Sequence, residues 1–196
     1  LRMASSLIES KQAKNGIMIC ADTYTKYISK TNTACRPIFS DAASAILISK
    51  STKNKIGAFE LGADGSGADA LELPTGTNEI VMNGAKVLTF AMDVVPNNVN
   101  KLLKKIKIDK KNIHKFVFHQ ASKYILDNIN RRLSIEKNKT FENYGKVGNT
   151  ISASIPIALK DAYTRRKISV NKKIIVAGYG VGLSWGSALI KWSKLL

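Results

Sequence analysis

A short buried strand that leads at once into an amphipathic helix is the feature that most limits how this chain can fold. The segment Phe116–Phe118 is aromatic and β-branched and is too brief for a helix, so it predicts a buried strand. Ile125, Ile129 and Leu133 then recur every four residues among polar side chains, which predicts a helix over 123–133. A strand that feeds a helix in this way indicates a layered α/β fold.

His119 stands at the turn between this strand and this helix. In layered α/β folds, ligands gather at the carboxyl ends of strands, because the next loop and helix offer backbone N–H groups and side chains to a crevice. His119 is therefore a candidate site residue. The alternative is that its imidazole only hydrogen-bonds a loop carbonyl.

The sequence divides into two units, 1–78 and 79–196. The glycine-containing stretch 49–77, at the end of the first unit, predicts a hairpin and a boundary between the two units. Each unit contains an apolar strand, a loop, and then Ser-Ala before a second apolar strand. In the first unit the two strands are Ile17–Ala21 and 44–47, and in the second unit they are Ile174–Ala177 and 187–190. The repetition predicts two similar halves built from a duplicated strand-and-helix unit.

Three single elements can be predicted in more detail. Gly16–Ala21 is a continuous apolar run, which is typical of a strand covered on both faces. Apolar residues three or four apart over 87–106 predict a helix that Pro96 kinks or divides into two. Gly178–Gly182 predicts a glycine-rich turn before the last strand.

The formal net charge of +17 favours anionic partners, and a basic nucleic-acid-binding domain is one alternative. The lysines are densest over 101–115, but Leu102, Leu103 and Ile106 interleave with them at helical spacing. This pattern favours a solvated helix face over a core rather than a groove that follows phosphates. The aromatic residues lie mostly inside apolar runs, so we expect no nucleic-acid partner.

No apolar run approaches the roughly 20 residues that cross a bilayer, so we expect no membrane span. The chain begins at Leu1 in what reads as the middle of a helix, so we expect a fragment. Cys20 and Cys35 form no CxxC pair and no metal-ligand spacing, which predicts a cytoplasmic setting and no metal. Cys20 is interpreted as core filler and Cys35 as a bystander.

Three motifs occur in order along the second half of the chain: His119–Ser122, Gly148–Pro156 and Gly180–Leu189. Together with 12–23 and 38–43, they resemble the β-ketoacyl-acyl-carrier-protein synthase III family, condensing enzymes of the thiolase fold. The resemblance implies an α/β protein with a thiolase-like layered α-β-α-β-α architecture, of which this chain is the carboxyl-terminal portion.

Members of this family use a cysteine, a histidine and an asparagine. By position, His119 matches the histidine and Asn149 the asparagine, whereas the cysteine is expected on a helix upstream of Leu1. The resemblance implies decarboxylative condensation of an acyl-CoA with malonyl-acyl-carrier protein in fatty-acid initiation or related acyl biosynthesis, without a cofactor. The His119 imidazole and the Asn149 amide would donate hydrogen bonds to the enolate oxygen.

Two positions depart from the family pattern. Ser122 stands where the family usually has asparagine. Val181 stands where it usually has glycine, in a turn that supplies backbone N–H groups to a second oxyanion site. Valine keeps that N–H unless the position needs a positive φ.

Arg131 and Arg132 match basic family positions that dock the acyl carrier protein, and a solvated helix face is their alternative interpretation. The resemblance also implies a homodimer. The alternative function is a non-catalytic subunit that binds an acyl carrier or pairs with an active homologue.

Overall fold

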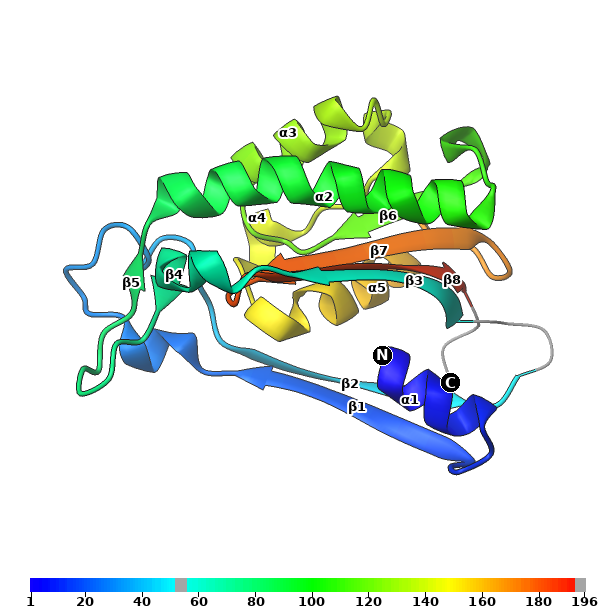
Figure 1. Ribbon diagram of the computed structural model, residues 1–196, viewed down its shortest axis with the longest axis horizontal. Coiled ribbons are helices and arrows are strands. Elements are labelled where there is room, and N and C mark those ends of the chain that lie inside the picture. The colour runs from blue at the N-terminus through cyan, green and yellow to red at the C-terminus, as the bar shows by residue number, and fades with distance from the viewer. Residues whose placement is uncertain (52–55, 193–196) are drawn as a thin grey trace.

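In the computed structural model, which describes residues 1–51 and 56–192, helices and sheets alternate in layers (Figure 1). Helices α2 (Gly84–Ile106) and α3 (Lys123–Arg132) cover one face of a four-stranded sheet. Helices α5 (Ser154–Thr164) and α1 (Arg2–Glu9) lie between that sheet and a two-stranded sheet. The described residues thus supply four layers in the expected α-β-α-β order.

The four-stranded sheet has the order β3-β8-β7-β6, in which only β6 and β7 are parallel. Its strands are β3 (Ile56–Ala63), β6 (Lys115–Phe118), β7 (Lys173–Gly180) and β8 (Ser184–Lys191). The other strands form two antiparallel pairs, β1 (Asn15–Asp22) with β2 (Ala42–Ser49) and β4 (Leu71–Glu72) with β5 (Val81–Met82). Short helices complete the described chain at Tyr24–Tyr27, Gly65–Ala70, Lys110–Asn112, Lys137–Lys139, α4 (Tyr144–Val147) and Ile151–Ala153.

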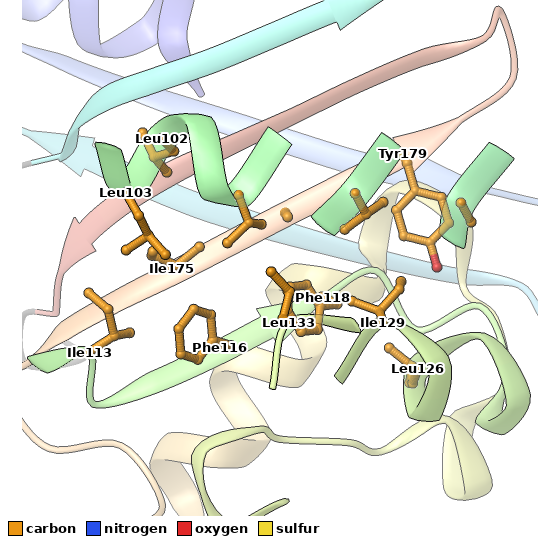
Figure 2. Close-up of a cluster of buried hydrophobic side chains, with 14 of the residues drawn as sticks. Leu102, Leu103, Ile113, Phe116, Phe118, Leu126, Ile129, Leu133, Ile175 and Tyr179 are labelled. Carbon is orange, nitrogen blue, oxygen red and sulfur yellow. The ribbon is translucent and has the colours of Figure 1, made fainter. Parts of the chain in front are cut away.

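Strand β6 is buried on both faces, as its sequence predicts. Phe116 and Phe118 point toward α2 and α3 (Figure 2), and Val117 packs on the other side with residues of α5. The neighbouring β7 alternates in the same way, with Ile175 on the first side and Val176 on the second. Since side chains alternate across a strand, these two neighbouring strands join both helical layers to one sheet.

The predicted helix after β6 is confirmed as α3. Ile129 and Leu133 are fully buried in the cluster of Figure 2, and Leu126 joins them. The predicted helix over 87–106 is also confirmed, but Pro96 does not divide it in two. Val95 and Val99 flank Pro96 and are buried in the same cluster, so packing on both sides of the proline holds one continuous helix.

The predicted repetition appears in the strand pairing. Segment Ile17–Ala21 lies in β1, which pairs antiparallel with β2, and segment Ile174–Ala177 lies in β7, which pairs antiparallel with β8. Residues 52–55 of the expected hairpin over 49–77 lie outside the described residues, and in the described part β3 pairs with β8 from the far end of the chain instead of with a neighbouring strand. Residues of the first predicted unit therefore complete the sheet of the second, while the division at residue 78 stays a prediction.

Two predictions about single strands were wrong. Strand β1 is not covered on both faces: Ile17 and Ile19 are 68% and 72% exposed, because α1 and the helical turn at Ile151–Ala153 contact this strand pair and nothing in the described chain covers the other side. Gly178–Gly182 is not all turn, since β7 extends through Gly180 and reverses only over 181–183.

Within the described residues, no helix combines the length and the apolar character needed to cross a membrane.

The side chain of Phe116 should contribute strongly to stability, because it is fully buried between β6 and the α2–α3 layer. We expect Phe116→Ala to lower the free energy of unfolding by about 3–5 kcal/mol, measured by urea denaturation. Tyr124→Ala is the matched control, since Tyr124 is 62% exposed, and should cost under about 1 kcal/mol. Equal losses in the two variants would contradict this account of the core.

Candidate active site

The backbone of His119 is fixed by the pairing of β6 with β7. Its N–H donates to the carbonyl of Ala177 at 2.9 Å, which continues the parallel pairing of β6 and β7 by one residue. The imidazole lies edge-on against the ring of Tyr179, with 5.2 Å between ring centroids and 89° between planes. The strand end thus holds both the position and the tilt of the imidazole.

Ser154 sets the hydrogen bonding of the imidazole. The His119 Nδ1 and Ser154 Oγ atoms are 2.7 Å apart, and Ser154 is only 2% exposed. The Gln120 N–H donates to the same Oγ at 3.4 Å, so the serine proton is free to point at Nδ1. When the serine hydroxyl donates to Nδ1, the imidazole carries its own proton on Nε2.

Burial lowers the pKa of His119 to about 4, and a hydrogen bond with the backbone of Ile151 acts in the opposite direction. Removing an imidazolium from water is unfavourable, so the neutral form is favoured. At neutral pH the side chain is therefore an uncharged imidazole with one N–H donor.

Asn149 is held in place by the first half of the chain. Its N–H donates to the carbonyl of Ile38 at 2.9 Å, and its carbonyl accepts from Ser40 N–H at 3.0 Å. The preceding Gly148 has φ +69°, and a Cβ there would lie 2.9 Å from Ser40 Oγ. Only glycine suits this close, left-handed turn.

The Asn149 side chain is oriented by its own turn. The N–H of Ile151 donates to Asn149 Oδ1 at 3.0 Å, so the carboxamide oxygen is occupied and the Nδ2 group points elsewhere. No acceptor for Nδ2 is found among the described residues. Because His119 also bonds the backbone of Ile151, the two predicted site residues meet at one residue. Their chemical roles stay predictions.

Ser122 and Val181 lie on the flanking loops. Ser122 is the N-cap of α3 and accepts from Ile125 N–H at 3.4 Å, a role that serine fills as well as asparagine. Val181 is 43% exposed in the turn after β7, and its φ is not positive. Valine therefore keeps an unstrained backbone N–H there, as the sequence analysis anticipates. Within the described residues, no hydrogen bond joins Ser122 or Val181 to His119.

Arg131 and Arg132 are not part of this site. They end α3, roughly 14 Å of helix from Ser122. Arg131 donates to Asn128 Oδ1, and Arg132 forms an ion pair with Asp93 of α2 at 2.5 Å. Both arginines are exposed, so they form a basic surface that is partly neutralised by Asp93.

Sequence reasoning missed three residues that shape the site. Ser154 bonds the imidazole, and its Oγ accepts from the N–H of Gln120, whose side chain is fully buried. Ile151 has φ +51°, a strained conformation for a β-branched residue and one that clusters at functional sites. Ser154 stands in a recognisable motif, but its contact with His119 joins segments 35 positions apart and leaves no local signal.

The two cysteines lie outside this site. Cys20 is on β1, and Cys35 is fully buried, which together with Glu79 raises the pKa of its thiol. In residues 1–51 and 56–192, no three His, Cys, Asp or Glu side chains are grouped as metal ligands would be.

Comparison with known families places these features in context. Residues 1–65 match the family model for 3-oxoacyl-[acyl-carrier-protein] synthase III, and residues 103–192 match the model for the carboxyl-terminal part of the same family. A β-ketoacyl-[acyl-carrier-protein] synthase III from Natranaerobius thermophilus is 36% identical over 98% of this chain and 64% of its own length. One from Staphylococcus epidermidis is 32% identical over 97% of this chain and 61% of its own length.

Solved structures agree. The synthase III of Aquifex aeolicus superposes with a TM-score of 0.93 at 30% identity, covering 97% of this chain and 62% of that one. The Thermus thermophilus enzyme gives 0.92 at 31%, covering 99% and 64%. The chain thus spans about three fifths of the length of its curated relatives, 61% and 64% for the two above. With both family models matched in order and the thiolase fold confirmed, the chain belongs to the 3-oxoacyl-[acyl-carrier-protein] synthase III family.

Proposed function

We propose that the full-length protein condenses an acyl-CoA with malonyl-acyl-carrier protein, with loss of carbon dioxide, to give a 3-oxoacyl-acyl-carrier protein. The observation that carries this proposal is that the side chains of His119 and Asn149 both interact with the backbone of Ile151. Asn149 Nδ2 has no acceptor among the described residues, and a bound oxyanion would replace the Ile151 backbone as the acceptor of the imidazole N–H. Two such donors in one place suit an oxygen that becomes negatively charged.

The chemistry requires this kind of stabilisation. Loss of carbon dioxide from a malonyl thioester leaves an enolate, whose oxygen carries negative charge until the carbon attacks the acyl group. His119 Nε2–H and Asn149 Nδ2–H would donate to this oxygen, each lowering the barrier by roughly 3 kcal/mol. A neutral imidazole suits the task, since it donates without giving up its proton.

Decarboxylation itself supplies the carbanion, so the proposed reaction needs neither a redox cofactor nor a metal. The acyl group must be held on a nucleophile while the enolate forms. Neither cysteine of this chain suits that role: Cys35 is buried with a raised pKa, and Cys20 lies on β1.

A homodimer in the cytoplasm is part of the proposal. The exposed apolar side chains of β1, Ile17 and Ile19, support a covered surface in the assembled protein. Cys20 and Cys35 are both free, which suits a reducing compartment.

The first test separates the two half-reactions. We expect His119→Ala in the full-length protein to slow the release of carbon dioxide from malonyl-acyl-carrier protein by about 10²–10³-fold, because one enolate donor is lost. Formation of the acyl-enzyme, followed by intact mass, should change little.

His114→Ala is the matched control, since the chain has two histidines, and should leave both steps intact. Loss of acyl-enzyme formation together with decarboxylation in His119→Ala would contradict the proposed role. Carrier binding without any turnover by the unaltered protein would favour a non-catalytic subunit.

The second test concerns the protonation of His119. In a ¹⁵N nuclear magnetic resonance titration, its imidazole should have a pKa of about 4 and carry its proton on Nε2 above that pH. Ser154→Ala should weaken the preference for this tautomer, because the donor to Nδ1 is removed. Ser152→Ala is the control, since Ser152 bonds Asp22 and not the imidazole. A charged imidazole at pH 7 in the unaltered protein would rule out the proposed donor.

The third test concerns docking of the acidic carrier protein. Reversing charge with Arg131→Glu and Arg132→Glu should raise KM for malonyl-acyl-carrier protein by roughly tenfold at low salt with little change in kcat, because long-range attraction is lost. The control pair is Arg165→Glu with Arg166→Glu, two adjacent arginines just beyond the end of α5, the helix on the opposite face of the sheet. An equal rise in both pairs, or in neither, would assign Arg131 and Arg132 to the ordinary solvated surface.

A further inference from the structure

A basic cavity lies at the opposite end of the sheet from His119. Its volume is about 470 Å³, within the range of small-molecule sites, and it opens beside the amino-terminal ends of β6 and β7. His119 follows the carboxyl end of β6, a strand of 4 residues, so roughly 13 Å of strand separates the cavity from the candidate active site. The cavity is therefore a separate feature.

The walls of the cavity carry an excess of positive charge. The walls come from three segments that are far apart in the sequence. Their basic side chains are Lys111, His114, Lys139, Lys172 and Lys173. No aspartate or glutamate lines it among the described residues. The nearby carboxylate of Asp109 lies 3.7 Å from Lys111 Nζ, and both groups are largely exposed.

Most of these ammonium groups have no anionic partner. Lys172 and Lys173 are exposed and make no ion pair or side-chain hydrogen bond within the part of the chain that the structure describes. Lys139 Nζ donates to the carbonyl of Lys111 at 2.7 Å, which fixes one charge in the cavity wall. Like charges held close together repel, and a bound anion would relieve that repulsion.

His114 adds an unsatisfied polar atom to the same wall. Its Nε2 is buried without a hydrogen-bond partner. Burial is the main cause that lowers the pKa of His114; the charges of Lys115, Lys172 and Lys139 act in the same direction, and a hydrogen bond with the backbone of Lys167 opposes them. This nitrogen lies beneath the accessible surface, so His114 senses the charge of the cavity without facing a ligand there.

We propose that this cavity binds a small anion with two or more negative charges on phosphate groups, such as a diphosphate. Lysine ammonium groups bind phosphate as point charges, and four of them line this cavity, of which Lys111 alone is paired with a carboxylate in the described residues. A bound anion would also act on His114 through its charge, because the pKa of His114 already responds to Lys172 and Lys139. The site does not depend on the condensation reaction, because its residues are separate from those of the candidate active site.

Calorimetric titration with inorganic diphosphate at low ionic strength tests the affinity. We expect Lys172→Gln with Lys173→Gln to weaken binding by about tenfold or more, because two cavity charges are removed. Both residues are exposed, so the variant should fold. Lys26→Gln with Lys30→Gln removes the same charge from the short helix Tyr24–Tyr27 and the residues after it, a segment drawn in blue at the other end of the molecule (Figure 1), and should change affinity less than about twofold.

The two histidines provide a second readout within one sample. Saturating diphosphate should raise the pKa of His114, because a nearby anion favours the imidazolium, and should leave His119 unchanged. Sodium chloride at equal ionic strength is the comparison. Replacing diphosphate with ADP shows whether the cavity takes a free diphosphate or one that is part of a nucleotide. Tighter binding of diphosphate or of ADP than of chloride supports the site.

Three results would overturn the proposal. The first is a shift in the His114 pKa that is no larger with diphosphate than with chloride, which would show simple screening. The second is an equal loss of affinity in the Lys26 and Lys30 variant and in the Lys172 and Lys173 variant, which would show attraction to overall charge. The third is a failure of both diphosphate and ADP to bind at low ionic strength.

Discussion

The parallel pairing of β6 with β7 is the interaction on which the rest of the protein depends. β7 is a central strand and β6 the edge strand beside it, and each sends alternate side chains to the α2–α3 layer and to the α5 layer. The same ladder ends with the bond from His119 N–H to Ala177, so the core and the candidate active site share one set of backbone hydrogen bonds. A shift of register between the strands would bury the wrong side chains and displace the imidazole together.

Around that ladder, the site is built from contacts that cross the whole chain. Ser154, the first residue of α5, meets the imidazole, and the segment around Ile38 fixes the backbone of Asn149. Tyr179 closes one side with its ring. Both site side chains interact with the backbone of Ile151, the residue with a positive φ. Burial of the His119 side chain lowers its pKa and so keeps the imidazole neutral.

Local patterns were sufficient to predict β6, α3 and α2, because each has a run or a period that few other structures share. They were insufficient for β1, where an apolar run looks the same whether one face or both are covered. They were also insufficient for β3, whose partner β8 lies more than 120 positions away in the sequence. His119 and Asn149 were found from the order of motifs, whereas Ser154 and Ile151 act through geometry that only the folded chain contains.

The hydrogen bonds between Asn149 and residues 38–40 limit how proteins with this architecture can evolve. The Asn149 backbone is bonded to Ile38 and Ser40, just before β2, whereas Ser154, a few residues later, bonds His119 at the end of β6, so the two donors depend on the spacing of the β1–β2 layer and the four-stranded sheet. Sliding one layer over the other to enlarge a binding pocket would pull the two donors apart. New specificities in this architecture should therefore arise by exchanging loops and side chains, with the stacking of the layers left intact.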